Sequence, residues 1–232
     1  MLNIMRHNLS VKTVFLHMLP LLFVVFVMAD DKSVIRTFGG ISDVKTSIAA
    51  SLQEIMTWNL CVISPVLLCY RIFNIEFSTV RFNTIIRSGK IDHWWKKRTI
   101  LIVFFNIGYS LLIILMDMIV NYDAPHPWLY VNFFIAFTTH ILFLSYIAIL
   151  TLILNSRLQW SIILYLIIEI IFIIFGIELS SWRKYLLPYW GMINNSVYIG
   201  GTAICHFLIT EVISLIVILM LNKLIMKHIL EK

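Results

Sequence analysis

Charged residues are scarce in this chain: Asp, Glu, Lys and Arg make up only 13% of its 232 residues. Hydrophobic residues make up 60%, and the mean hydropathy of +0.92 exceeds what a soluble domain can bury in its core. We therefore expect most of the chain to lie in lipid. The net charge of +6 does not indicate nucleic-acid binding, because the cations flank apolar runs and do not spread along one solvated face.

Cysteine is rare as well, with three residues in the whole chain. Cys61, Cys69 and Cys205 lie within or beside apolar stretches and show neither a C-x-x-C pair nor a Cys/His spacing, so we expect no disulfide framework and no zinc site. We interpret them as small buried apolar side chains.

Motifs of nucleotide binding and hydrolysis are missing. The sequence has no G-x-x-x-x-G-K-[ST] loop in which backbone amides could hold phosphates. It also lacks the H-E-x-x-H and G-x-S-x-G motifs of hydrolases. We therefore expect this chain to have no enzyme activity, cofactor or metal of its own.

Long apolar runs are what the sequence has in abundance. Because a membrane-spanning helix needs about 20 mostly apolar residues, the sequence predicts one all-α, multi-pass transmembrane domain over residues 1–232. The first candidate span ends at Ala29-Asp30-Asp31 without a convincing signal-peptide cleavage site, so we keep it. The six predicted spans are approximately 14–29, 54–73, 99–121, 129–154, 161–178 and 204–222.

The distribution of Lys and Arg predicts the orientation, because these residues accumulate in loops that are not translocated. With both termini in the cytoplasm, only Lys32, Arg36, Lys45, Arg183 and Lys184 fall outside. Trp128, Trp160, Trp182 and Tyr130 lie near span ends, as expected for an interfacial aromatic belt. The predicted cytoplasmic cations are Arg6, Lys12, Arg71, Arg81, Arg87, Lys90, Lys96, Lys97, Arg98, Arg157, Lys223, Lys227 and Lys232.

Residues 1–13 are too short and polar to span the membrane. Leu2, Met5 and Leu9 recur at helical spacing, and Arg6 and Lys12 are available to face phosphate head groups. We expect an interfacial helix on the inner side, with a disordered basic tail as the alternative.

Residues 179–203 are too apolar for an open outer loop, yet Pro188 and Gly191 interrupt any helix there. The pattern favours a broken, re-entrant hairpin that dips into the outer leaflet. A helical cap on the membrane surface is an equally good alternative. As candidates for an outer gate we select Trp182, Tyr185, Pro188, Tyr189 and Trp190.

Three polar residues within the predicted spans are candidates for a translocation path. Glu169 and His140 lie near the middle of their spans, where charge is costly and usually faces a protein interior or a cavity. Glu169 is the best candidate, and a neutral carboxyl bonded to a neighbouring helix is the alternative. His140 is interpreted first as a packing residue and second as a proton relay, because the sequence identifies no paired acid. Asn59 is the third candidate, although such residues more often hold helices together.

The segment Arg87–Arg98, RSGKIDHWWKKR, is the most specific local pattern. It resembles the Arg, Gly, Trp-Trp, Lys-Lys pattern that enters the third span in Gram-positive membrane subunits (permeases) of type-2 ABC exporters, especially those of peptide export or bacteriocin immunity. The similarity extends over most of the chain through the number of spans, the inside termini, the amphipathic start, the basic loop between spans two and three, and the broken hairpin before the last span.

The resemblance implies a coupling helix within residues 77–95, seated in a groove of a separate ATPase to which ATP and Mg²⁺ would bind. A plainer alternative is a topogenic positive patch on anionic lipid. The resemblance further implies two ATPase copies and a second permease subunit, identical or related, in a bacterial cell membrane. The candidate coupling residues are Arg81, Arg87, Lys90, Asp92, His93, Trp94 and Trp95.

The resemblance thus implies the export of an amphipathic substrate, such as a peptide or a lipid-like antimicrobial. Two other functions stay open at this point. A proton-coupled secondary transporter is one, because such carriers also use isolated acids at mid-depth. A stand-alone membrane immunity protein is the other.

Overall fold

The computed structural model describes Gly40 and residues 48–77, 91–120, 127–154, 158–192 and 201–230. The expected all-α class is confirmed for these residues. The predicted span 14–29 and the interfacial helix 1–13 lie outside them. The long helices are α4 (Ile48–Phe77), α6 (Ile91–Val120), α7 (Pro127–Leu154), α8 (Leu158–Glu178) and α10 (Gly201–Leu230), and the short 3₁₀ helices are η1 (Ser180–Tyr185) and η2 (Leu187–Trp190).

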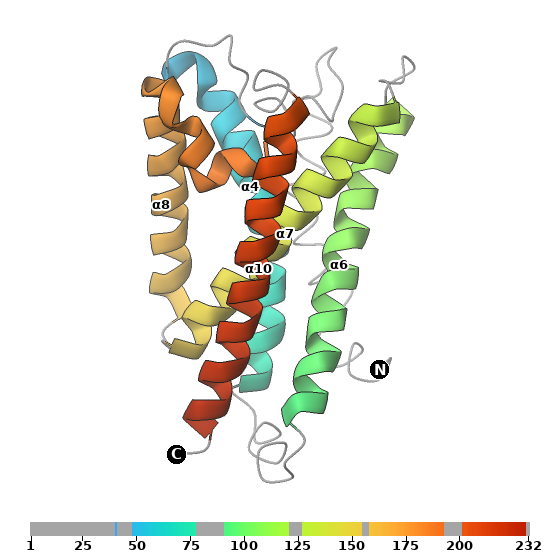
Figure 1. Cartoon of the computed structure of the whole chain (residues 1–232), viewed down its shortest axis with the longest axis vertical. Helices are drawn as coiled ribbons and strands as arrows, with labels where there is room; N and C mark the ends of the chain where they lie inside the picture. The colour runs from blue at the N-terminus through green and yellow to red at the C-terminus, as the bar shows by residue number, and fades with distance from the viewer. Residues whose placement is uncertain are drawn as a thin grey trace.

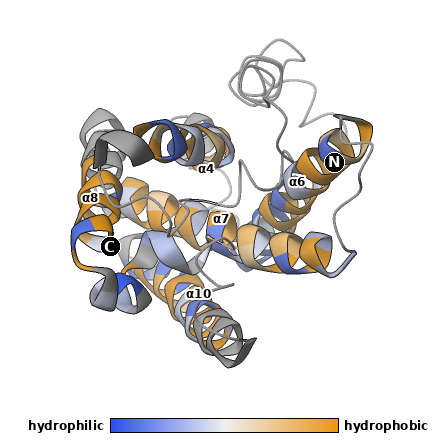
Figure 2. Cartoon of the chain, turned by 90° about the horizontal axis from the view of Figure 1, so that it is seen from above, coloured by the Kyte–Doolittle hydropathy of each residue, from blue (hydrophilic) through white to orange (hydrophobic). Residues whose placement is uncertain are grey.

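The five long helices form a bundle around α7. Successive helices run in alternating directions, so the ends of α4, α7 and α10 lie with the starts of α6 and α8 (Figure 1). Seen from above, α7 crosses the middle of the bundle between α4 and α10 (Figure 2), and it also packs against α6 and α8. Side chains on α7 are therefore largely enclosed by other helices, and those of α4 are buried to the same extent.

Among the residues that the structure describes, three helices are long and apolar enough to cross a membrane, and they indicate a membrane protein. These stretches are Leu52–Phe73, Ile91–Ile119 and Pro127–Ile153, which correspond to the second, third and fourth predicted spans. Helices α8 and α10 coincide with the last two predicted spans. That α8 and α10 also cross the membrane, and that the chain has six spans, stays a prediction.

The outward faces of the helices are apolar, as expected for lipid contact. The exposed side chains of α6 include Phe104 and Leu115, and those of α10 include Ile213 and Met220. Figure 2 shows hydrophobic colouring on the outside of the bundle. An exposed apolar surface that covers several helices is rare on soluble monomers and marks a membrane or partner contact.

Aromatic packing and buried hydrogen bonds hold the helices together. The ring of Phe137 on α7 stacks on Phe133 with centroids 5.0 Å apart, and meets Trp58 of α4 edge-on at 5.9 Å. Thr138 of α7 donates a 2.8 Å hydrogen bond to Ser110 of α6. Such bonds matter in lipid, where apolar side chains alone provide little drive for helix association.

Two of the three cysteines fulfil the expectation from the sequence. Cys61 and Cys69 of α4 are free thiols, and both are buried in the core of the bundle. The carbonyl oxygen of Cys61 accepts a 3.0 Å hydrogen bond from the hydroxyl of Tyr109 on α6. The side chain of Cys205 lies outside the described part of the chain.

Candidate functional site

A buried histidine–glutamate pair joins α7 to α10. The Nδ1 atom of His140 lies 2.7 Å from Oε1 of Glu211, and both side chains are 0% exposed. His140 is near the middle of α7. Two ionisable side chains therefore meet inside the bundle. Among the described residues, Glu211 is thus the paired acid that the sequence did not reveal.

The surroundings of the pair come from α4 and from residues 179–192, which contain η1 and η2, are predicted to lie on the outer side and are named the outer segment for that reason. The Trp58 ring of α4 lies beside the imidazole of His140, with centroids 5.7 Å apart. Gly191, which ends η2, packs so closely on the same ring that an added Cβ would come within 2.5 Å of its Cγ. The imidazole is therefore enclosed by three elements besides its own helix.

Several polar atoms of this site lack hydrogen-bond partners within the described ranges. They are Nε2 of His140, Oε2 of Glu211 and Nε1 of Trp58. An unsatisfied polar atom in an apolar interior costs about 1–3 kcal/mol. Buried groups of this kind are found where a proton, a water molecule or a ligand completes the hydrogen bonding.

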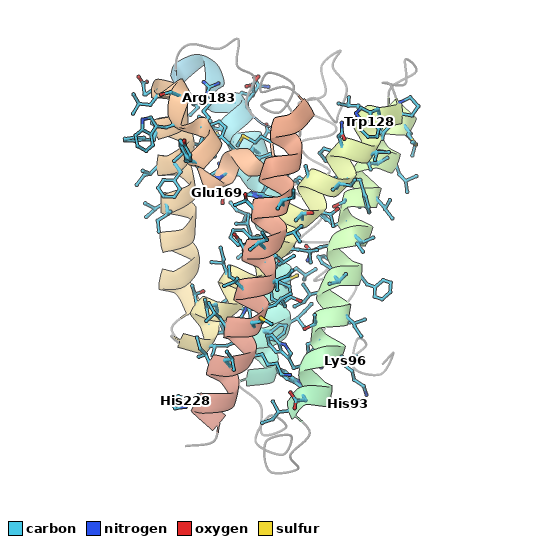
Figure 3. The ribbon with its side chains drawn as sticks, in the orientation of Figure 1. His93, Lys96, Trp128, Glu169, Arg183 and His228 are labelled. Atoms are coloured by element: carbon cyan, nitrogen blue, oxygen red, sulfur yellow. The ribbon has the colours of Figure 1, made fainter. Side chains whose placement is uncertain are left out.

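The other two path candidates have different surroundings. Glu169 points from α8 into the bundle and is 2% exposed (Figure 3). Asn59 is also buried, but its Nδ2 donates a 2.8 Å hydrogen bond to the carbonyl of Ile55 in its own helix. The bond favours a structural role for Asn59, the alternative already weighed from the sequence.

The outer segment is fastened to α8. The hydroxyl of Tyr189 donates a 2.7 Å hydrogen bond to the carbonyl of Ile173, and Nε of Arg183 donates a 2.6 Å bond to the carbonyl of Gly176. The Arg183 guanidinium also lies 5.8 Å from the centre of the Tyr189 ring. Burial raises the pKa of Tyr189 from 10.0 to about 12, although the cationic Arg183 opposes the change.

The gate candidates divide into two groups by exposure. Pro188 and Tyr189 are buried, whereas Trp182 and Tyr185 are exposed and meet edge-on with ring centroids 6.0 Å apart. The side chain of Trp190 is outside the described set. Two 3₁₀ helices, η1 and η2, occupy this stretch. Their entry into the outer leaflet as a re-entrant hairpin stays a prediction.

The opposite end of the bundle carries an aromatic cluster, which consists of Phe73, Trp94 and Trp95. The Phe73 ring at the end of α4 meets Trp94 at 5.7 Å and Trp95 at 5.9 Å, both edge-on. The two indoles are only 7% and 6% exposed, so they hold α4 against α6 and present little surface to a partner. Helix α6 begins at Ile91 and therefore extends N-terminally beyond the predicted third span, which starts near residue 99.

Basic side chains gather at this same end. His93, Lys96 and His228 lie there, opposite Trp128 and Arg183 (Figure 3). Asp92 and His93 are exposed, and Asp92 forms a 3.0 Å ion pair with Lys223 of α10. The coupling candidates Arg81, Arg87 and Lys90 lie outside the described residues. The basic end of the bundle therefore flanks the segment expected to face the cytoplasm.

One aromatic assignment needs correction. Tyr130 was expected in the interfacial belt, but it is 8% exposed and its hydroxyl donates a 2.8 Å hydrogen bond to Oδ2 of Asp117. The buried carboxylate offers a stronger partner than the membrane interface, which draws the ring inward. Trp128 and Trp182 are exposed, in keeping with the belt.

No protein family, curated protein or solved structure matches this chain. The resemblance to permeases of type-2 ABC exporters therefore stays a prediction from the sequence.

Proposed function

We propose that this chain is the membrane subunit of an ATP-driven exporter that moves an amphipathic substrate, a peptide or a lipid-like antimicrobial, out of the cell or its membrane. ATP is hydrolysed by a separate subunit, present in two copies, and a second permease subunit completes the pathway. The chain lies in a bacterial cell membrane with both termini in the cytoplasm.

The observation that carries this proposal is the aromatic cluster of Phe73, Trp94 and Trp95. It ties the end of α4 to the start of α6, the two helices that bracket residues 78–90. If an ATPase moves residues 78–90, α4 and α6 move together, because the packed aromatic rings keep the two helix ends in contact. A loop that only orients the protein in the membrane does not require such an aromatic contact between the helices on either side of it.

The charge at this end supports a docking role. Arg71, Lys96, Lys97 and Lys223 are exposed there. The segment 78–90 between α4 and α6 contains further cations in its sequence. Positive surface of this kind speeds the association with an acidic partner and fixes its register. It also agrees with a cytoplasmic location.

The test reverses three charges together, Arg81→Glu, Arg87→Glu and Lys90→Glu. An associated ATPase then no longer copurifies with the chain, and its substrate-stimulated turnover is lost. A matched control reverses Arg157, Lys227 and Lys232, three cations also predicted in the cytoplasm, with the same change in net charge. If the ATPase stays bound and stimulated in the first variant, the docking assignment is wrong.

A second candidate, a proton-coupled carrier, is favoured by the buried pair of His140 and Glu211. Buried acids and histidines inside membrane domains mark proton relays in carriers. Vesicles that contain this chain alone separate the two candidates, because a carrier moves cargo with an ion gradient and no ATPase.

A further inference from the structure

The His140–Glu211 pair lies away from the end of the bundle that the proposed ATPase would contact. Its 2.7 Å separation places one proton between Nδ1 of His140 and Oε1 of Glu211 when the imidazole is the donor. The second atoms of both groups, Nε2 and Oε2, have no hydrogen-bond partner in the described part of the chain. The pair therefore has the capacity to take up or release a further proton.

Gaining or losing that proton changes the charge buried in the bundle. A neutral imidazole beside a carboxylate carries one negative charge, whereas one more proton leaves the pair without net charge. Both side chains are 0% exposed, and an uncompensated charge in apolar surroundings is costly. Proton binding is consequently linked to how closely α10 packs on α7.

The end of η2 covers one side of the His140 ring. The backbone of Gly191 lies on the imidazole ring, and Met192 packs in turn on Gly40. A shift of η2 away from α7 would uncover the ring from the side where Arg183 and Trp128 lie (Figure 3).

We propose that His140 and Glu211 form a proton-binding site whose occupancy is linked to the packing of α10 on α7. A proton taken from outer water at Nε2 converts the neutral imidazole to an imidazolium, which stays paired with the Glu211 carboxylate. Release reverses this step. A proton fits better than a metal ion, because no group of three or more His, Cys, Asp or Glu lies together among the described residues.

Other ionisable groups lie on the elements packed around α7. They include Glu54 on α4, Asp117 on α6 and Glu169 on α8, and Arg183 lies in η1, which packs on α8. Asp117 accepts the hydrogen bond of Tyr130, and Arg183 donates to the carbonyl of Gly176. A test of the site must therefore separate its response from theirs by substituting the pair itself.

Trp58 provides a local reporter, because an imidazolium quenches the fluorescence of an adjacent indole. The full-length chain in lipid nanodiscs is titrated from about pH 8 to about pH 5, the range in which histidine ordinarily changes charge. We expect fluorescence to fall as pH falls. Trp58→Phe removes this component, His140→Gln abolishes it, and the exposed-carboxyl control Glu178→Gln retains it.

A second measurement detects protonation of the Glu211 carboxyl. It keeps the proposal testable if the His140 variant does not fold. Infrared difference spectra between high and low pH report carboxyl protonation, and Glu211→Gln removes the contribution of this residue. Circular dichroism identifies any variant that has lost its helices. A pH-dependent signal in either readout that substitution of the pair abolishes supports the site. Identical titrations in the wild type, His140→Gln and Glu211→Gln would overturn it, whatever the ATPase does.

Discussion

Tyr189 covers Gly176: the phenol ring of η2 lies where a side chain on that residue of α8 would project. Only a glycine permits this approach, which positions the hydroxyl for its bond to Ile173. This contact and the neighbouring hydrogen bond from Arg183 to the Gly176 carbonyl hold the segment against α8.

Gly176→Ala tests the contact directly. The added methyl collides with the Tyr189 ring, and overpacking of this kind costs about 1–3 kcal/mol. We expect a lower apparent unfolding temperature in detergent. Gly108→Ala is the matched control, because nothing lies within 4 Å of a Cβ at that helical position. It should be neutral or stabilising, since alanine favours helix over glycine. Equal behaviour of the two variants would contradict the close packing.

The phenol of Tyr189 makes the outer segment sensitive to alkali. Burial raises its pKa to about 12, above the ordinary 10.0, so the folded state favours the protonated phenol. Its contribution to stability is complete below pH 10 and is lost as pH rises towards 12. Tyr189→Phe removes this pH dependence and the hydrogen bond, which is worth about 1 kcal/mol. Apparent unfolding temperatures of both proteins between these pH values check the prediction; parallel curves would contradict it.

Trp94→Ala weakens the aromatic cluster that holds α4 against α6. Replacing a buried aromatic ring by alanine costs about 3–5 kcal/mol. Under the proposed function, an ATPase still binds residues 78–90, but its turnover no longer responds fully to substrate. Copurification and ATPase assays separate these two effects. Trp128→Ala is the control, because that indole is 65% exposed at the opposite end. Normal stimulation in a folded Trp94→Ala protein would show that the cluster does not transmit movement.

Lys223→Ala should have little effect on stability. Lys223 and Asp92 are 54% and 81% exposed, and exposed ion pairs contribute at most about 1 kcal/mol. Thermal unfolding at low and high salt measures the contribution. The double variant Asp92→Lys with Lys223→Asp keeps the pair with its charges exchanged. If Lys223→Ala lowers stability much more than this and the double variant restores it, the pair fixes α10 to α6.

The sequence predicted the described long helices well, because apolar runs of membrane length leave the chain few alternatives. It did not predict that α6 already begins at Ile91, because the basic residues His93, Lys96 and Lys97 precede the apolar run. The burial of Trp94 and Trp95 against Phe73 depends on how α4 meets α6, which local composition does not encode.

The candidate site was only partly predictable. His140 stood out as an ionisable residue in mid-span, but its partner Glu211 is 71 positions away. Glu211 is the only acidic residue in the predicted last span, a signal that marks it without revealing what it contacts. Trp58 and Gly191 join the site only through the crossing of α4 and the return of η2. These are consequences of tertiary packing.

Reconstitution is the most direct measurement of the proposed export function. Vesicles are prepared with this chain and its partner permease, with or without the separate ATPase, and labelled amphipathic peptide is followed across the membrane. We predict movement only when both the ATPase and ATP are present. Movement driven by an ion gradient in vesicles that contain this chain alone would contradict the proposal.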